Sequence, residues 1–168
     1  MAHNVTSAVV SNQDATPISK IMPLGKGGVK RSYYGYATVV ATTAGQTTCF
    51  VRVPARGRLQ SVKVTNLTGM GNGSVKLGVY RPVGGIEVKS DAISAAVDLG
   101  TARTTPTEVL AAPSVANRAL AISDWLTTEI GTASATNDVE LDIVANVVTV
   151  STGTAVAVAL EAEVILPE

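Results

Sequence analysis

Few residues of this chain could perform chemistry. The 168-residue sequence has one histidine, His3, and one cysteine, Cys49. A structural zinc site needs four Cys or His ligands and a disulfide needs two cysteines, so neither can form within one chain. A Cys–His nucleophile pair would depend on a histidine close to the chain end. We therefore expect no catalytic residue, no metal site and no cofactor, and we interpret Cys49 as a small buried hydrophobe.

Three acidic residues, Asp138, Glu140 and Asp142, alternate along one predicted strand. Alternation places Glu140 and Asp142 on one face of the strand, where paired carboxylates can bind Ca²⁺ or hydrolyse a glycosidic bond. The stretch has no calcium-loop pattern and no nearby aromatic residue to hold a sugar. A solvated outer face is the interpretation that the sequence favours.

The composition is that of a folded, strand-rich chain. Apolar residues make up 46%, charged residues 15%, and the mean hydropathy is +0.30, which excludes a disordered chain. Val, Ala and Thr dominate, and β-branched side chains favour strands. The start of the chain does not have the pattern of a secretory signal, and the longest strongly apolar tract, Ala155–Leu160, is far too short to span a membrane. We expect no membrane partner.

Period-two alternation of apolar and polar residues recurs from Tyr33 to the end of the chain. Each such run predicts a strand with one buried face, and Gly- or Pro-containing turns separate the runs. At 49–53 the pattern places Cys49, Val51 and Val53 inward, with Phe50 and Arg52 opposite. Further runs lie at 62–65, 75–80, 86–89, 139–143, 148–151 and 156–164. Many short alternating strands predict an all-β, antiparallel β-sandwich or jelly roll.

Two segments differ from this pattern. Residues 1–32 mix Asn, Ser, Thr, Pro and Gly, and we expect an extended N-terminal arm preceding a β-sandwich domain over 33–168. Within 114–131 the apolar residues fall at helical spacing, which predicts one or two short helical turns. Ser123 is the expected N-cap, and Trp125 with Leu126 should close one end of the sandwich.

The order of certain motifs resembles a known family. The sequence Gly57-Arg58-Leu59-Gln60-Ser61-Val62-Lys63-Val64 is followed by Val75-Lys76-Leu77-Gly78-Val79-Tyr80 and the small-residue stretch Ala92–Leu99. Asn117-Arg118, Trp125-Leu126, the strand Asp138–Val144 and a long final strand come next. This layout, over about 44–166, is similar to the jelly-roll-type head decoration (cement) proteins of tailed bacteriophages.

The resemblance implies a non-enzymatic virion protein. Such a protein binds the outer surface of the major capsid protein lattice, often as a trimer, and stabilises the head. It is made in the host cytoplasm and resides on the capsid surface. The arm, residues 1–30, matches no pattern in this family.

Charge is distributed unevenly along a chain whose net charge is zero. Residues 1–81 carry +9 and residues 82–168 carry −9. Early and late strands can neutralise each other within a sandwich, because they pair side by side. Alternatively, a basic arm with Lys20, Lys26, Lys30 and Arg31 could bind an acidic partner surface, such as a capsid subunit or the Glu161/Glu163 face of another copy. Deleting residues 1–30 would then weaken attachment.

Other functions remain open at this level. A head-fibre base, neck or tail component would have the same general sequence features. A carbohydrate-binding β-sandwich module normally displays exposed aromatic residues, and the tyrosines at 33, 34 and 36 are interpreted as sheet packing. The scattered cations and the sequence pI of about 6.6 argue against nucleic-acid binding. An enzyme is the least favoured class.

Overall fold

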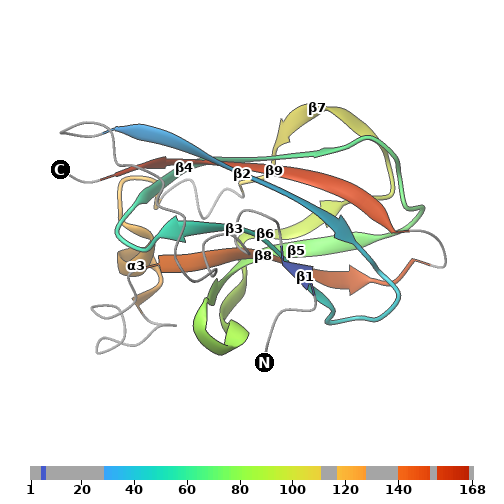
Figure 1. Cartoon of the computed structure of the whole chain (residues 1–168), viewed down its shortest axis with the longest axis horizontal. Coiled ribbons are helices and arrows are strands. Elements are labelled where there is room, and N and C mark those ends of the chain that lie inside the picture. The colour runs from blue at the N-terminus through green and yellow to red at the C-terminus, as the bar shows by residue number, and fades with distance from the viewer. Residues whose placement is uncertain (1–4, 7–28, 111–116, 128–139, 152–154, 167–168) are drawn as a thin grey trace, which may run out of the picture.

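The computed structural model describes residues 5–6, 29–110, 117–127, 140–151 and 155–166, and these residues form two packed β-sheets (Figure 1). One sheet contains, in spatial order, β1 (Val5–Thr6), β3 (Thr47–Pro54), β8 (Glu140–Thr149), β5 (Ser74–Arg81) and β6 (Ile86–Asp98). The other contains β2 (Lys30–Val39), β9 (Val156–Ile165), β4 (Arg58–Asn66) and β7 (Arg103–Glu108). In Figure 1 the second sheet forms the upper layer.

The strand order confirms the predicted jelly roll. From β2 to β9 the chain passes between the sheets at every connection except the β5–β6 hairpin. All pairs among these eight strands are antiparallel, and the sheet orders 2-9-4-7 and 3-8-5-6 interleave early with late strands. The short β1 adds to the free edge of β3 in the parallel direction, with Val5 opposite Thr48.

The core lies between the two sheets and is built from small and medium-sized side chains. On β9 the predicted alternation is confirmed, since the inward positions from Val156 to Val164 are buried. Phe50, Leu77, Ile93 and Leu141 from the facing sheet complete the same cluster. Burying each side chain of this size contributes about 1.5–3 kcal/mol to folding.

A β-bulge in β3 overturns part of the predicted alternation. The register changes between Cys49, opposite Val144, and Val51, opposite Ile143. The extra residue turns Phe50 into the core beside Val51, whereas Cys49 lies with Tyr80 and Val144 in a second buried cluster. The inward position of Cys49 and the outward position of Phe50 were therefore wrong, although Cys49 is buried as predicted.

The strand prediction over 139–151 also needs correction. Two runs, 139–143 and 148–151, were expected as separate strands, but a single strand, β8, covers Glu140–Thr149. Nothing interrupts it, because the residues between the two runs carry no Gly or Pro turn signal. Val148 and Val150 are exposed instead of buried.

Two single helical turns are described, η1 (Val83–Gly85) and α3 (Ile122–Trp125). The N-cap of α3 is Ala121, not Ser123, because the amide of Ser123 donates to the carbonyl of Ala55 and the amide of Ile122 to that of Gly57, both at 2.9 Å. These bonds dock the turn on the β3–β4 connection. Leu126 is buried and Trp125 packs partly buried against the core, as predicted for a plug at one end.

The expected arm contributes to both sheets. β1 lies within residues 1–32, and β2 begins at Lys30, so the sheet includes the last residues of the predicted arm. Residues 1–4 and 7–28 lie outside the described part of the chain. The division into an arm and a sandwich domain remains a prediction.

Candidate functional site

The outer face of the four-stranded sheet is where the structure gathers exposed aromatic and charged side chains. Because Val156 to Val164 point inward on β9, Ala157, Ala159, Glu161 and Glu163 point outward. Strand register sets their neighbours. Tyr34 of β2 and Lys63 of β4 flank Glu161, and Tyr36 and Thr65 flank Ala159.

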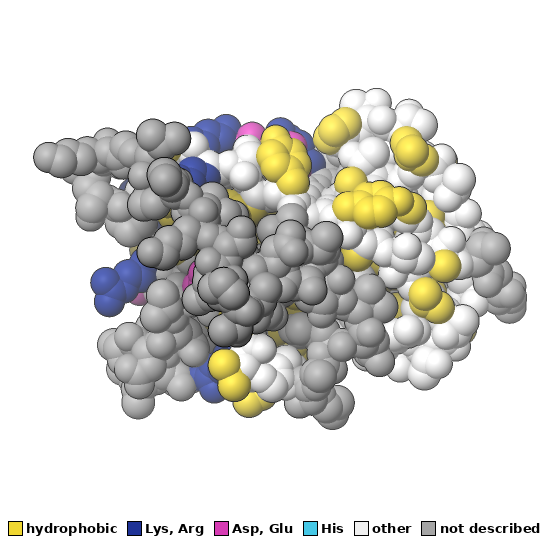
Figure 2. Space-filling model, in the orientation of Figure 1, with side chains coloured by type: hydrophobic (Ala, Val, Ile, Leu, Met, Phe, Trp, Pro, Cys, Tyr) yellow, Lys and Arg dark blue, Asp and Glu magenta, His cyan; other side chains and the backbone are white. Residues whose placement is uncertain are grey.

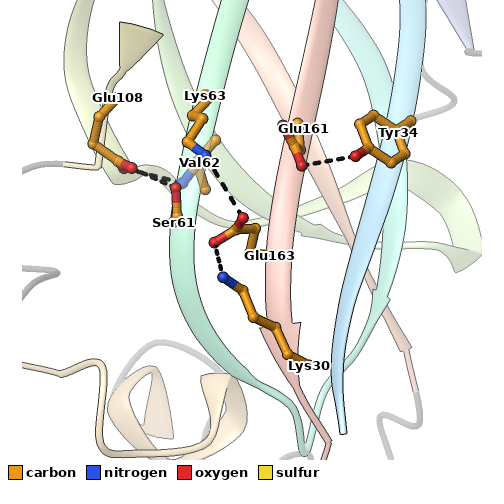
Figure 3. A network of polar contacts seen from close by, with 8 residues as sticks. All are labelled: Lys30, Tyr34, Ser61, Val62, Lys63, Glu108, Glu161 and Glu163. Carbon is orange, nitrogen blue, oxygen red and sulfur yellow. Dashed lines mark hydrogen bonds and ion pairs between the residues drawn. The ribbon is translucent and has the colours of Figure 1, made fainter. Parts of the chain in front are cut away.

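One end of this face is a charged cluster that links three strands (Figure 3). Lys30 Nζ lies 2.7 Å from Glu163 Oε2, and Lys63 Nζ lies 3.6 Å from Glu163 Oε1. The hydrogen bond from Lys30, together with the charges of both lysines, lowers the pKa of Glu163 from its ordinary value. Glu163 on the central strand therefore holds the edge strand β2 and the neighbouring β4.

Glu108 has a comparable structural role at the far edge of the sheet. Its carboxylate accepts hydrogen bonds from the Ser61 hydroxyl and from the Val62 amide at 3.0 Å (Figure 3). It also accepts one from the Leu110 amide at 3.1 Å. These bonds join the end of β7 to β4. The carboxylate is thus satisfied by the protein itself.

Two exposed tyrosines stand next to the charged cluster. Tyr34 is 60% exposed and Tyr36 64% exposed. The Tyr34 hydroxyl donates to Glu161 Oε1 at 2.8 Å, which holds the ring against β9 (Figure 3). In Figure 2 hydrophobic side chains reach the surface over the upper layer of the sandwich, which contains β2 and β9.

A hollow of about 420 Å³ opens between β2 and β7 on this face. We call it the tyrosine hollow. Its lining comprises Tyr34, Gly35, Tyr36, Lys63, Thr65, Pro106, Ala159, Leu160 and Glu161. The small side chain of Ala159 leaves space in the middle, while tyrosine rings stand on one side and Pro106 on the other. The hollow is open, mostly apolar, and edged by a few polar groups.

The exposed tyrosines were not predicted, although the sequence contains a signal for them. The tyrosines at 33, 34 and 36 were all expected to pack on the sheet, and only Tyr33 packs partly buried against the core. Burial raises the pKa of the Tyr33 hydroxyl. The inward positions Gly35, Ala37 and Val39 are two residues apart, so alternation already required Tyr34 and Tyr36 to face outward.

The structure describes two of the four predicted arm cations. Lys20 and Lys26 lie outside the described residues, while Lys30 and Arg31 belong to β2. Lys30 pairs with Glu163 of its own chain. Three ion pairs join a base from the first half of the sequence to an acid from the second half: Lys30–Glu163, Lys63–Glu163 and Arg52–Asp142. This agrees with neutralisation between early and late strands.

The predicted acidic face of β8 is only partly solvated. Glu140 is exposed, but Asp142 is fully buried and pairs with Arg52, its register partner on β3. The solvated interpretation was therefore wrong for Asp142. Among the residues that the structure describes, no three His, Cys, Asp or Glu side chains are grouped as metal ligands would be.

The described residues contain no helix long and apolar enough to cross a membrane. No protein-family model and no curated protein matches the sequence. Solved structures do match, and they share the jelly-roll fold of this chain.

Two of these structures are similar over nearly their whole length. A chain from the capsid of Ralstonia phage GP4 has a TM-score of 0.64 at 12% identity, covering 98% of each chain. A chain from the cyanophage Pam1 capsid asymmetric unit has a TM-score of 0.51 at 14% identity, covering 92% of this chain and 97% of the other. At these identities the likeness establishes a shared fold.

Proposed function

We propose that this chain is a structural protein of a phage particle, and specifically a decoration or cement protein on the outside of the head. The observation that carries the proposal is the end-to-end structural match to a chain of a phage capsid, 98% of each. The motif order between Gly57 and the last strand supports it independently, because it is a property of the sequence and not of the fold comparison. The proposed partner is the major capsid protein, and the proposed location is the capsid surface.

The proposed mechanism is adhesion without turnover. A two-sheet sandwich with bulged and hydrogen-bonded strands is a rigid body, so it loses little conformational entropy on binding. A trimer would present three copies of each contact, and linked contacts raise the overall affinity far above that of one contact. The N-terminal cations Lys20, Lys26 and Arg31 are the proposed capsid-binding residues, with Lys30 at the base of the arm.

A head-fibre base, neck or tail component is the runner-up within the same class. The jelly roll suits each of these positions, so the fold does not distinguish between them. The number of copies per particle does distinguish between them. A decoration protein occurs in hundreds of copies per particle, whereas a neck or fibre component occurs in about a dozen.

The decisive experiment is a comparison of particles with and without the gene for this chain. We expect intact particles to contain the protein in hundreds of copies by quantitative mass spectrometry, and an electron-microscopy map to show additional external density at lattice positions. Particles lacking it should lose DNA at a lower temperature. A copy number near a dozen would favour the neck or fibre position, and absence from purified particles would refute a virion role.

A further inference from the structure

Two exposed tyrosines lie on the otherwise polar outer face of β2, and folding alone does not explain them. Tyr34 and Tyr36 leave most of their surface in water, and the other outward positions of β2 are Lys30, Ser32 and Thr38. Large aromatic side chains contribute to stability mainly through burial, so neither ring is needed at its position for the core. Grouped exposed apolar side chains beside a hollow mark a binding surface.

The tyrosine hollow has the size of a small-ligand site. Its volume of about 420 Å³ lies within the range of roughly 300–1,000 Å³ that is typical of such sites. Ala159 at its centre keeps the floor free of a bulky side chain. The two tyrosines are two residues apart on one strand face, so their Cα atoms are about 7 Å from each other along β2.

The polar groups around the hollow do not select a charged ligand. Lys63 and Glu161 face each other across neighbouring strands, and Lys63 also lies 3.6 Å from Glu163. The positive and negative charges are thus balanced locally. The Thr65 hydroxyl, the Tyr34 hydroxyl and the Glu161 carboxylate can still exchange hydrogen bonds with a ligand.

The tyrosine hollow is held in place before any ligand binds. The hydrogen bond from Tyr34 to Glu161 holds one ring. Gly35, between the two tyrosines, packs so closely on the carbonyl of Phe50 that β2 cannot shift inward. A pre-organised surface on a rigid strand reduces the entropy lost on binding.

We propose that the tyrosine hollow binds a neutral carbohydrate. A sugar ring has one face of C–H groups, which packs on an aromatic ring, and a rim of hydroxyls, which hydrogen-bond to mixed donors and acceptors. The hollow offers both kinds of contact and no net charge. This function goes beyond attachment to a shell and does not depend on it, so a protein that fails to bind capsids could still bind a sugar.

The test is a binding measurement on the full-length protein with a defined probe set. The probes are neutral tri- to hexasaccharides of glucose, galactose, mannose and N-acetylglucosamine, with a sulfated oligosaccharide for comparison. We expect at least one neutral probe to bind with a Kd tighter than about 1 mM, and Tyr36→Ala to weaken that binding at least about tenfold. Tyr34→Phe should weaken it less, because it keeps the ring and loses the bond to Glu161.

Two further variants make the outcome decisive. Ala159→Leu fills the hollow without replacing either tyrosine and should also abolish binding, which covers the case that Tyr36→Ala disturbs the strand. Val83→Ala truncates another exposed apolar side chain, on the β5–β6 turn away from the hollow, and should change nothing.

Three results would overturn the proposal. The first is no binding by any neutral probe at about 1 mM. The second is binding that Tyr36→Ala and Ala159→Leu leave intact, or binding restricted to the sulfated probe. The third is loss of capsid attachment by Tyr36→Ala with no sugar binding by the parent protein, which would assign the same surface to a protein partner.

Discussion

Arg52 and Asp142 form a buried ion pair on the outward side of the five-stranded sheet. Arg52 Nε donates to Asp142 Oδ1 at 2.7 Å and Nη2 donates to Oδ2 at 3.3 Å. The residues are register partners on β3 and β8, and Asp142 is fully buried. The pair joins a base from the basic first half of the sequence to an acid from the acidic second half, and so favours the pairing of β3 with β8.

Removing one member of this pair should be costly. Asp142→Ala leaves the Arg52 guanidinium buried beside an apolar side chain, and we expect the free energy of unfolding to fall by about 3–5 kcal/mol. Urea denaturation at one fixed protein concentration measures it. The double variant Arg52→Met/Asp142→Leu removes both charges and should recover much of that loss.

Glu140→Ala is the matched control, because Glu140 is an exposed carboxylate on the same strand. Its effect should stay within about 0.5 kcal/mol. If Asp142→Ala cost no more than Glu140→Ala, the ion pair would not contribute to stability.

Acidification should loosen the charged cluster around Glu163. The pKa of Glu163 is lowered below its ordinary 4.5 by the hydrogen bond from Lys30 and the charges of Lys30 and Lys63. A carboxyl with a lowered pKa in the folded state stabilises the protein above the pKa of the unfolded chain, and this contribution is lost as the pH falls through the folded-state pKa. The loss begins near pH 4.5 and is complete below the lowered value.

Glu163→Gln should therefore be less stable than the parent at pH 7, and the difference should shrink at pH 3. Urea midpoints of both proteins at the two pH values give the comparison. Glu161→Gln serves as a control, since no ion pair with Glu161 occurs among the described residues. A parent–variant difference that is the same at pH 7 and pH 3 would contradict the assignment.

Gly35 should not tolerate a methyl group. A Cβ at this position would collide with the backbone carbonyl of Phe50, which the β3 bulge directs toward β2. Backbone cannot move aside as a flexible side chain can, so we expect Gly35→Ala to destabilise the fold by about 1–3 kcal/mol. Thermal unfolding measures the effect, with Thr38→Ala at an exposed position of the same strand as control. Equal midpoints for the two variants would show that β2 can shift.

The sequence was sufficient for the layers of this fold and for the buried face of its clearest strand. The alternation from Val156 to Val164 predicts which side of β9 enters the core, because apolar and polar residues alternate there without interruption. The bulge in β3 was not visible, since both Cys49 and Phe50 are apolar and either could face inward. Likewise, no local pattern shows that Arg52 and Asp142, far apart in sequence, become register partners.

Only part of the candidate site could be predicted from the sequence. The outward direction of Tyr34 and Tyr36 follows from alternation on β2. The hollow beside them also needs Ala159 of β9 and Pro106 of β7, which are neighbours only through the interleaved strand order. A cation's role depends on its partner too, and Lys30 pairs with Glu163 of the same chain.

The proposed capsid contact of the N-terminal cations predicts a salt-sensitive loss of attachment. Deleting residues 1–30 is a poor test, because it also removes β1 from the edge of β3 and Lys30 from Glu163. Lys20→Ala/Lys26→Ala removes two charges and leaves both features in place. We expect this variant to unfold like the parent and to bind decoration-free capsids at least about tenfold more weakly in co-sedimentation at low salt.

The difference should narrow at high salt, since added ions screen the attraction between exposed charges. Arg56→Ala/Lys76→Ala is the matched control: it removes two positive charges from the sandwich and alters the net charge equally. Because attraction at a specific interface depends on where the charges lie, only the arm variant should lose affinity. Equal losses in the two variants would mean that net charge, and not the arm, governs attachment.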